Sequence, residues 1–294
     1  MKRAVVIAQS HSHDGQKDLK QAGDELRKRG VAVDASHLET GHKAIRKRLR
    51  QYVKSKAELI VLVGGDGTQT IAADALSHSE SVLGIVPAGT GNSFAMSVGI
   101  DSLEAAFDAI AYGRVERIDV GVVNGTRFAN FATIGLAAVV SDRTPRWLKH
   151  LTGPLAYGLS AVGPLLNHRA FDARVRWKKN RLRIETQQIL VVNGRMYGHT
   201  PITPESTPND GMLTFFATTR TSPIDVARTY LSFLNNTQTA IPEAHYFRSK
   251  KLTVKTSRKA LVSIDGSALC KTPATFSVDR AALAVCVPNA HRFD

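Results

Sequence analysis

Two short apolar runs, each followed directly by a glycine-rich turn, constrain the fold of this chain most strongly. Residues 59–63 read LIVLV and precede the turn GGDGT at 64–68, while residues 82–86 read VLGIV and precede the turn PAGTGN at 87–92. Runs of this kind are typical of strands that are covered on both faces, as in a parallel sheet. Because ligands bind beyond the carboxyl ends of parallel strands, we expect both turns to converge on one site.

The composition of these turns is suited to phosphate binding. Glycine lets backbone N–H groups approach phosphate oxygens closely, and the helix that follows such a turn favours negative charge at its N-terminus. Asp66 adds a carboxylate, a ligand that phosphate-bound Mg²⁺ accepts. Neither turn is a Walker loop or a Rossmann fingerprint, because Gly-Lys-Ser/Thr and the G-x-G-x-x-G spacing are both absent. The residues expected to contact the nucleotide are Gly64, Gly65, Asp66, Gly67, Thr68, Gly89, Thr90, Gly91 and Asn92.

The two turns and two later segments together resemble a family of lipid kinases. Residues 64–68 are similar to the GGDGT signature shared by diacylglycerol kinases, sphingosine kinases, NAD kinases and phosphofructokinases. Residues 87–95 resemble the P-x-GTGN-x-FA segment of the diacylglycerol, sphingosine and ceramide kinase branch. Residues 203–213 resemble the AP…DG-x-L loop of that branch, and residues 262–266 resemble its late strand and Asp-Gly turn. The matches follow the order of the family from about residue 58 to the end of the chain.

The resemblance implies an enzyme that transfers the γ-phosphoryl group of ATP, with Mg²⁺ or another divalent cation, to a lipid hydroxyl. The acceptor would be diacylglycerol, ceramide or a sphingoid base. The resemblance places the general base at Asp265, assigns Asp66 to the catalytic metal or its water shell, and assigns Asp210 to a structural metal or loop-ordering site. Taken alone, Asp265-Gly266 is an ordinary hairpin turn.

Three positions depart from the family pattern. Residues 8–12 read AQSHS where the family has an Asn-Pro near the end of its first strand. Ser93 and Ser267 stand where family members often have Asp and Glu, which join the GGDGT aspartate in a water-mediated Mg²⁺ network. A hydroxyl is a weaker ligand for Mg²⁺ than a carboxylate, so Asp66 is the clear carboxylate of this network. Sphingosine kinases also lack the first acid, which favours a sphingoid-type acceptor.

Two other interpretations stay open. An NAD kinase-like enzyme would share GGDGT, although the 87–92 turn and the late Asp265-Gly266 turn argue against it. A non-catalytic lipid- or nucleotide-binding relative is compatible with the loss of two acids at Ser93 and Ser267. The pattern indicates neither an oligomeric state nor which lipid is the acceptor.

The periodicity of the chain changes near residue 117. Strand-like and helix-like segments alternate before it, which predicts an N-terminal three-layer α/β domain with a parallel sheet at residues 1–117. Alternating strand-like runs follow, which predicts a C-terminal antiparallel β-sandwich at residues 118–294 with helical insertions near 143–168 and 223–234. The resembling family has the same two-domain plan, with its active site in the cleft between the domains.

The strongly positive charge of the chain indicates an anionic partner. There are 39 Lys and Arg against 25 Asp and Glu, a formal net charge of +14. The cations cluster at residues 42–56, on a probable hairpin at 174–183 and at 248–259. One such cluster is typical of a solvated face, but three together favour attraction to an anionic membrane surface. No zinc spacing, RNA-binding aromatic pattern or recognition helix supports a nucleic-acid partner.

Residues 143–151 mix cations with apolar side chains and are the most membrane-like segment. We expect Arg146, Trp147, Leu148 and Leu151 to border the acceptor-lipid pocket and touch the bilayer, the alternative being a helical hairpin packed on the sandwich.

No apolar stretch reaches the roughly 18 residues that a spanning helix needs, and no N-terminal signal region is present. Cys270 and Cys286 lack metal-ligand spacing and are typical of free thiols. The sequence therefore predicts a cytoplasmic protein that associates peripherally with the inner face of the cell membrane.

Overall fold

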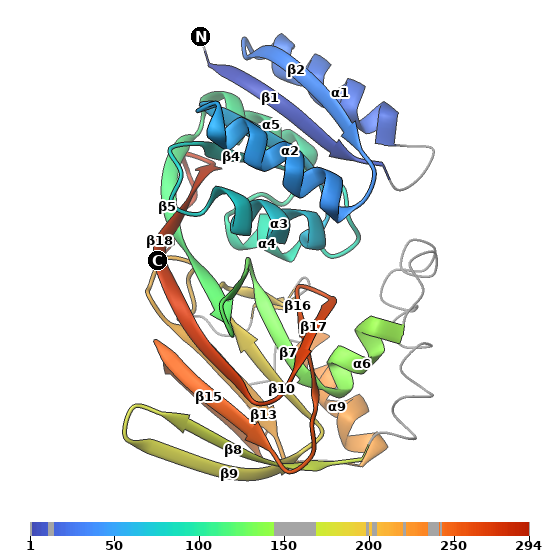
Figure 1. Ribbon diagram of the computed structural model, residues 1–294, viewed down its shortest axis with the longest axis vertical. Coiled ribbons are helices and arrows are strands. Elements are labelled where there is room, and N and C mark those ends of the chain that lie inside the picture. Colours follow the sequence, from blue (N-terminus) through green and yellow to red (C-terminus); the bar gives the residue numbers. More distant parts are fainter. Residues whose placement is uncertain are drawn as a thin grey trace.

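Two β-sheets and the helices packed on them make up the fold, described from a computed structural model (Figure 1). The larger sheet has ten strands and runs through both halves of the molecule, and the smaller sheet has six strands. An additional pair is formed by β11 (Met196–Tyr197) and β12 (Thr200–Pro201). The residues that the structure describes are 2–10, 15–143, 169–197, 200–201, 205–219, 222–234, 241 and 243–293.

The N-terminal half is a parallel sheet with helices on both faces, which confirms the predicted α/β arrangement. Its strands lie in the order β2-β1-β3-β4 and pair in parallel. All six residues of β3 are buried, as expected for a strand covered on both sides. The strands are β1 (Arg3–Gln9), β2 (Ala32–Glu39), β3 (Leu59–Gly64) and β4 (Val82–Pro87).

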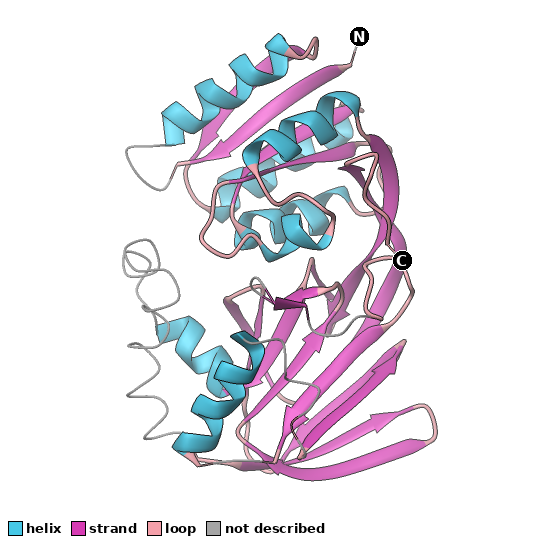
Figure 2. Cartoon of the chain, turned by 180° about the vertical axis from the view of Figure 1, so that it is seen from behind, coloured by secondary structure: helices cyan, strands magenta, loops and turns pink. Residues whose placement is uncertain are grey.

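Two layers of helices cover this sheet (Figure 2). Val5 and Ile7 of β1 pack in one core with α2, α3 and α4, whereas Ala4 and Val6 pack in another core with α1; α5 contributes side chains to both cores. The split follows from the two-residue period of a strand, which points successive side chains to opposite faces. The helices are α1 (Gly15–Lys28), α2 (His42–Lys54), α3 (Asp66–Leu76), α4 (Ser93–Ser97) and α5 (Leu103–Tyr112).

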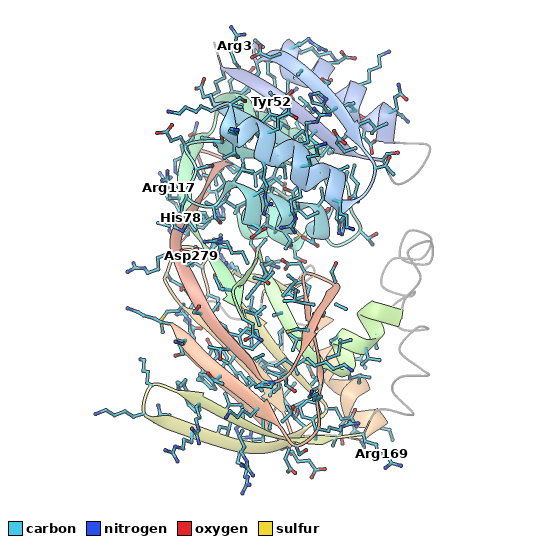
Figure 3. All side chains as sticks on the ribbon, viewed as in Figure 1. Arg3, Tyr52, His78, Arg117, Arg169 and Asp279 are labelled. Carbon is cyan, nitrogen blue, oxygen red and sulfur yellow. The ribbon has the colours of Figure 1, made fainter. Side chains whose placement is uncertain are left out.

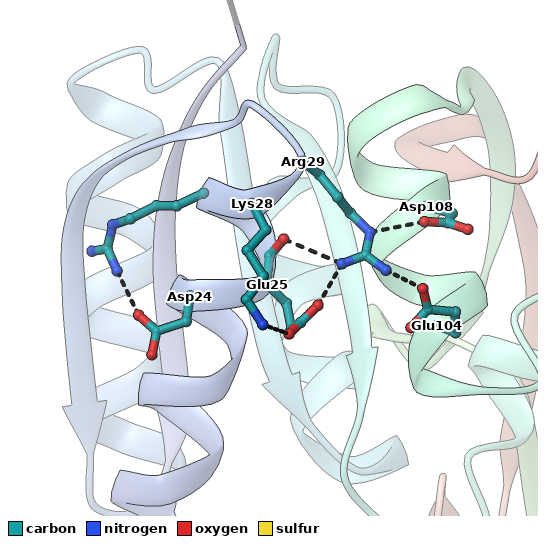
Figure 4. A network of polar contacts seen from close by, with 7 residues as sticks. Asp24, Glu25, Lys28, Arg29, Glu104 and Asp108 are labelled. Atoms are coloured by element: carbon teal, nitrogen blue, oxygen red, sulfur yellow. Dashed lines mark hydrogen bonds and ion pairs between the residues drawn. The ribbon is translucent and has the colours of Figure 1, made fainter.

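Arg29 joins the two helices of the second layer (Figure 4). Its guanidinium lies 2.6 Å from Glu25 Oε2 of α1 and 2.8 Å from Asp108 Oδ1 of α5, and it also contacts Glu104. The Arg29 side chain is only 11% exposed, so these carboxylates supply the charge balance that a partly buried cation needs. The cluster fixes the spacing of α1 and α5 over the sheet.

The C-terminal half is an antiparallel β-sandwich, as predicted. The smaller sheet has the order β14-β13-β10-β7-β16-β17, and it packs against the β18-β15-β8-β9 part of the larger sheet. Phe128, Phe215 and Phe276 are fully buried between them. The strands are β5 (Arg114–Val123), β6 (Thr126–Phe128), β7 (Phe131–Gly135), β8 (Phe171–Trp177), β9 (Asn180–Thr186), β10 (Gln188–Val192), β13 (Leu213–Thr218), β14 (Ala244–Ser249), β15 (Lys251–Thr256), β16 (Leu261–Ile264), β17 (Ser267–Lys271) and β18 (Ala274–Val287).

Strands β5 and β18 pass through both halves of the molecule. β18 pairs with β5 and β15 in antiparallel fashion and with β4 in parallel. Leu283 and Val285 of β18 belong to a core of the N-terminal half, whereas Phe276 belongs to the core of the sandwich. The predicted boundary between the two domains, at residues 117/118, falls inside β5. We therefore propose that the domains divide within a strand that both of them share, and not in a linker.

A polar cluster joins the end of α3 to β18 at the junction of the halves (Figure 3). His78 Nε2 lies 2.9 Å from Asp279 Oδ1, and Arg127 Nη2 of β6 lies 2.7 Å from Asp279 Oδ2. The β5–β18 register shifts between Asp279 and Leu283, which marks a bulge at this point. The cluster therefore fixes β18 where it passes from one half to the other.

Helices α6 (Leu136–Arg143) and α9 (Pro223–Leu234) belong to the C-terminal half. α9 confirms the helical insertion predicted at 223–234. The insertion predicted near 143–168 lies outside the described residues beyond Arg143, and so do Arg146, Trp147, Leu148 and Leu151. Among the described helices, none is both long enough and apolar enough to cross a membrane.

Candidate active site

The two glycine-rich turns lie in direct backbone contact at the carboxyl ends of β3 and β4. A Cβ atom added at Gly89 would stand 2.6 Å from the Cα of Gly65, and one added at Gly65 would stand 3.1 Å from the Cα of Gly89. A real Cβ atom essentially never lies within 3.0 Å of such a neighbour. The close approach therefore requires glycine at position 89, and it brings together the two turns that the sequence singled out.

Two side chains of these turns hold the turns in shape. Asn92 has a left-handed φ of 47°; its Oδ1 accepts from the Gly89 N–H at 2.9 Å and its Nδ2 donates to the Gly89 carbonyl at 2.7 Å. Thr68 is buried and donates its hydroxyl to Gln9 Oε1 at the end of β1. Thr90, by contrast, is exposed on the second turn. The side chains of Thr68 and Asn92 therefore support the turns from within, while Thr90 lies at the surface of the second turn.

Asp66 lies between the two turns. It is the first residue of α3, and its Oδ1 accepts from the Phe94 N–H at 3.0 Å. A Cβ atom added at Gly91 would stand 2.9 Å from Asp66 Oδ2, so only a glycine allows this carboxylate to lie against the second turn. The first turn thus supplies a carboxylate to the edge of the second.

Asp265 lies in the tight turn between β16 and β17 and is 6% exposed. Its carboxylate is aimed at the connection between β6 and β7. Oδ2 accepts from the Ala129 N–H at 2.8 Å, while Oδ1 accepts from the Asn130 N–H at 3.1 Å and the Phe131 N–H at 2.8 Å. Positive φ values of 43° at Asp265 and 81° at Gly266 are those of a type I′ hairpin turn, for which Asp-Gly is a preferred sequence.

Burial raises the pKa of the Asp265 carboxyl to about 6. Hydrogen bonds from Thr70, Phe131 and Ala129 oppose this rise because they favour the ionised form, and the negative charge of Asp66 adds to the rise. A carboxyl with this pKa is mostly ionised at neutral pH, and it is a stronger proton acceptor than an ordinary aspartate. This property is the one that the predicted general-base role of Asp265 calls for.

Thr70 links Asp66 and Asp265, two of the three aspartates that the sequence singled out. Its Oγ1 donates to Asp265 Oδ2 and also lies 3.0 Å from the backbone carbonyl oxygen of Asp66. A hydroxyl carries a single proton, so Thr70 donates to one of these oxygens at a time. Through Thr70, the helix that begins at the GGDGT turn contacts the carboxylate of the C-terminal half.

Asn130 links Asp265 to α4, the helix that follows the second glycine-rich turn. Besides its backbone bond to Asp265, its Oδ1 accepts from Ser97 Oγ of α4 at 3.0 Å, and its Nδ2 donates to the Met196 carbonyl at 2.6 Å. The side chain is fully buried. Sequence reasoning missed Thr70 and Asn130; the available signal was a polar residue within an otherwise buried segment.

Asp210 faces an arginine. Its Oδ2 contacts Arg248 Nη2 of β14 and accepts from the Thr207 N–H at 2.8 Å, while its Oδ1 accepts from the Met212 N–H at 2.7 Å. Asp119 of β5, another residue that sequence reasoning missed, is buried and accepts from the Gly211 N–H of the same loop at 2.6 Å. The loop at 207–212 is therefore ordered by hydrogen bonds and a guanidinium, and the metal role suggested for Asp210 stays a prediction.

Comparison with known proteins identifies the family. The family model described as "Diacylglycerol kinase catalytic domain" matches residues 3–123. The family model described as "YegS C-terminal NAD kinase beta sandwich-like domain" matches residues 130–287. This chain belongs to the diacylglycerol kinase family. The homology supports a kinase of the lipid-kinase type.

Relatives of the kinase match along most of its length. The diacylglycerol kinase of Staphylococcus saprophyticus is 26% identical over 269 residues, which cover 90% of this chain and 88% of that protein. The diacylglycerol kinase of Staphylococcus aureus is 25% identical over 294 residues, which cover 98% of this chain and 93% of that protein.

Solved structures of Bacillus anthracis proteins share the fold of this kinase. A protein assigned to the diacylglycerol kinases superposes with a TM-score of 0.81 at 22% identity, covering 97% of this chain and 95% of that one. A crystal structure of a diacylglycerol kinase superposes with a TM-score of 0.69 at 20% identity, covering 97% and 96%.

The two serines that replace family acids lie at the glycine-rich turns of this kinase. The Oγ of Ser93 would be 3.8 Å from a Cβ atom at Gly91, and the Oγ of Ser267 would be 3.9 Å from one at Gly67. Among the described residues, no three His, Cys, Asp or Glu side chains are grouped to hold a metal ion. Mg²⁺ often takes one or two carboxylates together with substrate phosphates, so Asp66 fits a cation that is bound jointly with ATP.

Removing divalent cations is expected to leave the 207–212 loop intact. Because the Arg248 guanidinium already balances the Asp210 charge, EDTA should not lower the thermal unfolding midpoint of the nucleotide-free kinase. Differential scanning fluorimetry with and without EDTA measures this. In the Arg248→Gln variant the cation is missing, and added Ca²⁺ or Mg²⁺ should raise the midpoint. A lower wild-type midpoint in EDTA would contradict the expectation.

Proposed function

We propose that this kinase transfers the γ-phosphoryl group of ATP to the hydroxyl of a lipid. The observation that carries the proposal is the position of Asp265, a buried carboxylate with a raised pKa that accepts a hydrogen bond from α3. That helix begins at the first glycine-rich turn, so a proton acceptor lies beside the predicted phosphate site. The names of the staphylococcal relatives support a lipid as the acceptor.

In this proposal the ATP phosphates lie along the two glycine-rich turns. Backbone N–H groups of the turns, other than the Gly89 N–H that donates to Asn92, donate to phosphate oxygens, and we expect Thr90 to add its hydroxyl. Thr68 and Asn92 act indirectly, because their side chains are engaged with Gln9 and Gly89. Asp66 would hold Mg²⁺ or another divalent cation, which offsets the charge of the phosphates when it is bound.

Asp265 accepts the proton of the lipid hydroxyl as that oxygen attacks the γ-phosphorus and the bond to the ADP oxygen breaks. The Asp265 carboxylate accepts four hydrogen bonds. Three come from backbone N–H groups, and the fourth comes from the Thr70 hydroxyl, which can turn away. Its hydroxyl can rotate to the Asp66 carbonyl oxygen, which lies 3.0 Å away. The rotation frees a lone pair of Asp265 Oδ2, which can then accept the proton of the acceptor hydroxyl.

Phosphate transfer from γ-labelled ATP to a panel of acceptors tests the proposal. Diacylglycerol is the first candidate because of the relatives, and ceramide and sphingoid bases follow because Ser93 replaces an acid that sphingosine kinases also lack. Labelled lipid would support the proposed reaction and identify the acceptor class. Labelled NADP from NAD would instead indicate an NAD kinase-like enzyme. The absence of any labelled product, with ATP binding retained, would indicate a non-catalytic relative.

The Thr70→Val variant is expected to shift the activity profile to higher pH. Thr70 donates to the ionised form of Asp265, so losing its hydroxyl raises the pKa of Asp265 further above about 6. The acid limb of the kcat/KM profile should move up by about one pH unit. The Thr70→Ser variant keeps the hydroxyl and should retain the wild-type profile. An unchanged acid limb in Thr70→Val would show that the titrating group is not an aspartate bonded to Thr70.

We also propose that the kinase works at the anionic inner face of the cell membrane. Its acceptor would reside there, and the net charge of +14 favours attraction to acidic headgroups. The four residues 146–148 and 151 that the sequence assigns to bilayer contact remain part of this proposal.

A further inference from the structure

One outer face of the sandwich carries an array of cations. It is formed by β15, β8 and β9, whose alternate residues point away from the core and are exposed. The hairpin β8–β9 forms the end of the molecule opposite the N-terminus (Figure 1). The exposed cations of this face and of the turn between β8 and β9 are Arg174, Arg176, Lys178, Lys179, Arg181, Arg183, Lys251 and Lys255.

The strand register places these cations directly opposite one another. Arg174 lies between Lys255 of β15 and Arg183 of β9, which makes a row of three positive charges across three strands. Arg176 and Arg181 form a second like-charged pair. Like charges that face each other across a ladder destabilise a sheet. The fold therefore carries a stability cost at this face that a solvated surface does not require.

Few acids neutralise this array. The ion pairs formed within the described part of the chain include none of its cations. Asp172 and Glu185 lie on the same face, but they oppose each other at one end of the hairpin. The other charged side chains of β8, β9 and β15 on this face are cations.

Protection of a sheet edge explains only part of the array. β9 is the last strand of the larger sheet, and cations on an edge strand discourage pairing with another chain. That argument covers Arg181 and Arg183. It does not account for Arg174 and Arg176 of β8 or for Lys255 of β15, because neither of these strands lies at the edge of the sheet.

We propose that the outer face of β15-β8-β9 docks on the anionic surface of a membrane. Adjacent strands lie about 4.8 Å apart, so the cations form a two-dimensional array that suits a surface of acidic headgroups. The choice of a membrane as partner rests on the lipid acceptor proposed above. A single-stranded nucleic acid would call for aromatic side chains on which bases stack, whereas Trp177 of this hairpin is stacked on Phe247 with ring centroids 3.8 Å apart.

Co-sedimentation of the full chain with lipid vesicles tests this docking face. One variant carries Arg174→Gln, Arg176→Gln, Arg181→Gln and Arg183→Gln. The matched control carries Lys43→Gln, Lys47→Gln, Arg50→Gln and Lys54→Gln, which removes the same charge from exposed positions of α2. The vesicles contain phosphatidylcholine with or without phosphatidylglycerol, and neither ATP nor an acceptor is added.

The hairpin variant is expected to lose about tenfold or more in affinity for phosphatidylglycerol vesicles, while the α2 control stays within about twofold of wild type. The hairpin variant should be at least as thermostable as wild type, because like-charged pairs are removed. Equal losses in both variants would mean that net charge alone drives binding, and would overturn the proposal. Retained binding by the hairpin variant, or binding of the wild type to duplex DNA but not to vesicles, would also overturn it.

The outcome of this experiment is separate from that of the lipid kinase assay. A wild-type chain that binds the vesicles through the hairpin but phosphorylates no lipid would support the docking face and contradict the proposed reaction. A chain that phosphorylates a detergent-solubilised lipid but binds no anionic vesicle would support the proposed reaction and contradict the docking face.

Discussion

The Asp265→Asn variant is expected to lose phosphoryl transfer by about 10²- to 10⁴-fold in kcat, the usual contribution of a general base. An amide of the same shape cannot accept the proton of the lipid hydroxyl. ATP binding should persist, because the residue contacts Thr70 and the backbone of 129–131 rather than the glycine-rich turns. Single-turnover transfer and ATP titration by calorimetry separate the two effects. Wild-type transfer by this variant would contradict a base at position 265.

The stability of the same variant needs a control, because an amide fits the site imperfectly. If the side-chain oxygen of the new asparagine keeps the hydrogen bonds from Asn130 and Phe131, its NH₂ group faces the Ala129 N–H. Two donors then oppose each other, which lowers the free energy of unfolding by about 1–3 kcal/mol.

The pH dependence of unfolding supplies an independent test. The pKa of Asp265 is raised from 3.8 to about 6 in the folded chain, so its contribution to stability is complete below 3.8 and is lost as the pH rises through 6. The Asp265→Asn variant should lack this dependence.

The Gly89→Ala variant is expected to separate the two glycine-rich turns and to weaken ATP binding strongly. Its Cβ atom would stand 2.6 Å from the Gly65 Cα and 3.0 Å from Asn92 Oδ1, so the backbone of one turn must move. Overpacking of this kind costs about 1–3 kcal/mol of stability. Denaturant unfolding measures the cost, and the rise in melting temperature on adding ATP measures the loss of binding.

The Gly67→Ala variant is the matched control for that effect on stability. The same methyl group is added in the other turn, but its nearest neighbours are 3.9 Å away, at His42 Cε1 and Ser267 Oγ. Its unfolding free energy should therefore stay close to that of wild type. Equal stability of the two variants would indicate that the turns do not pack against each other in solution.

Much of the fold could be predicted because it follows from local patterns. The apolar run before Gly64 specifies a buried strand, and the glycines after it specify a turn that helix α3 can follow. The two-residue alternation of β8 specifies which of its residues face the core. The predicted α/β and β-sandwich arrangement was confirmed for these reasons. The roles assigned to Asp66, Asp265 and the glycines stay predictions.

Part of the site could not be predicted, because it depends on contacts between distant residues. Thr70 and Asp265 are 195 positions apart in the sequence, and their hydrogen bond exists only because the β16–β17 turn meets α3. Arg248 lies 38 positions from Asp210, so no motif showed that a guanidinium would contact this carboxylate.

The sequence by itself determined the α/β and β-sandwich character of the two halves, the glycine-rich turns and the excess of positive charge, since each depends on residues that are neighbours along the chain. Only the tertiary structure decided that β18 joins the two halves, that Thr70 and Asn130 hold Asp265, and that Arg174 lies between Lys255 and Arg183. The physical reason is that register and long-range pairing are set by how whole sheets pack. A local period of two or 3.6 residues does not contain that information.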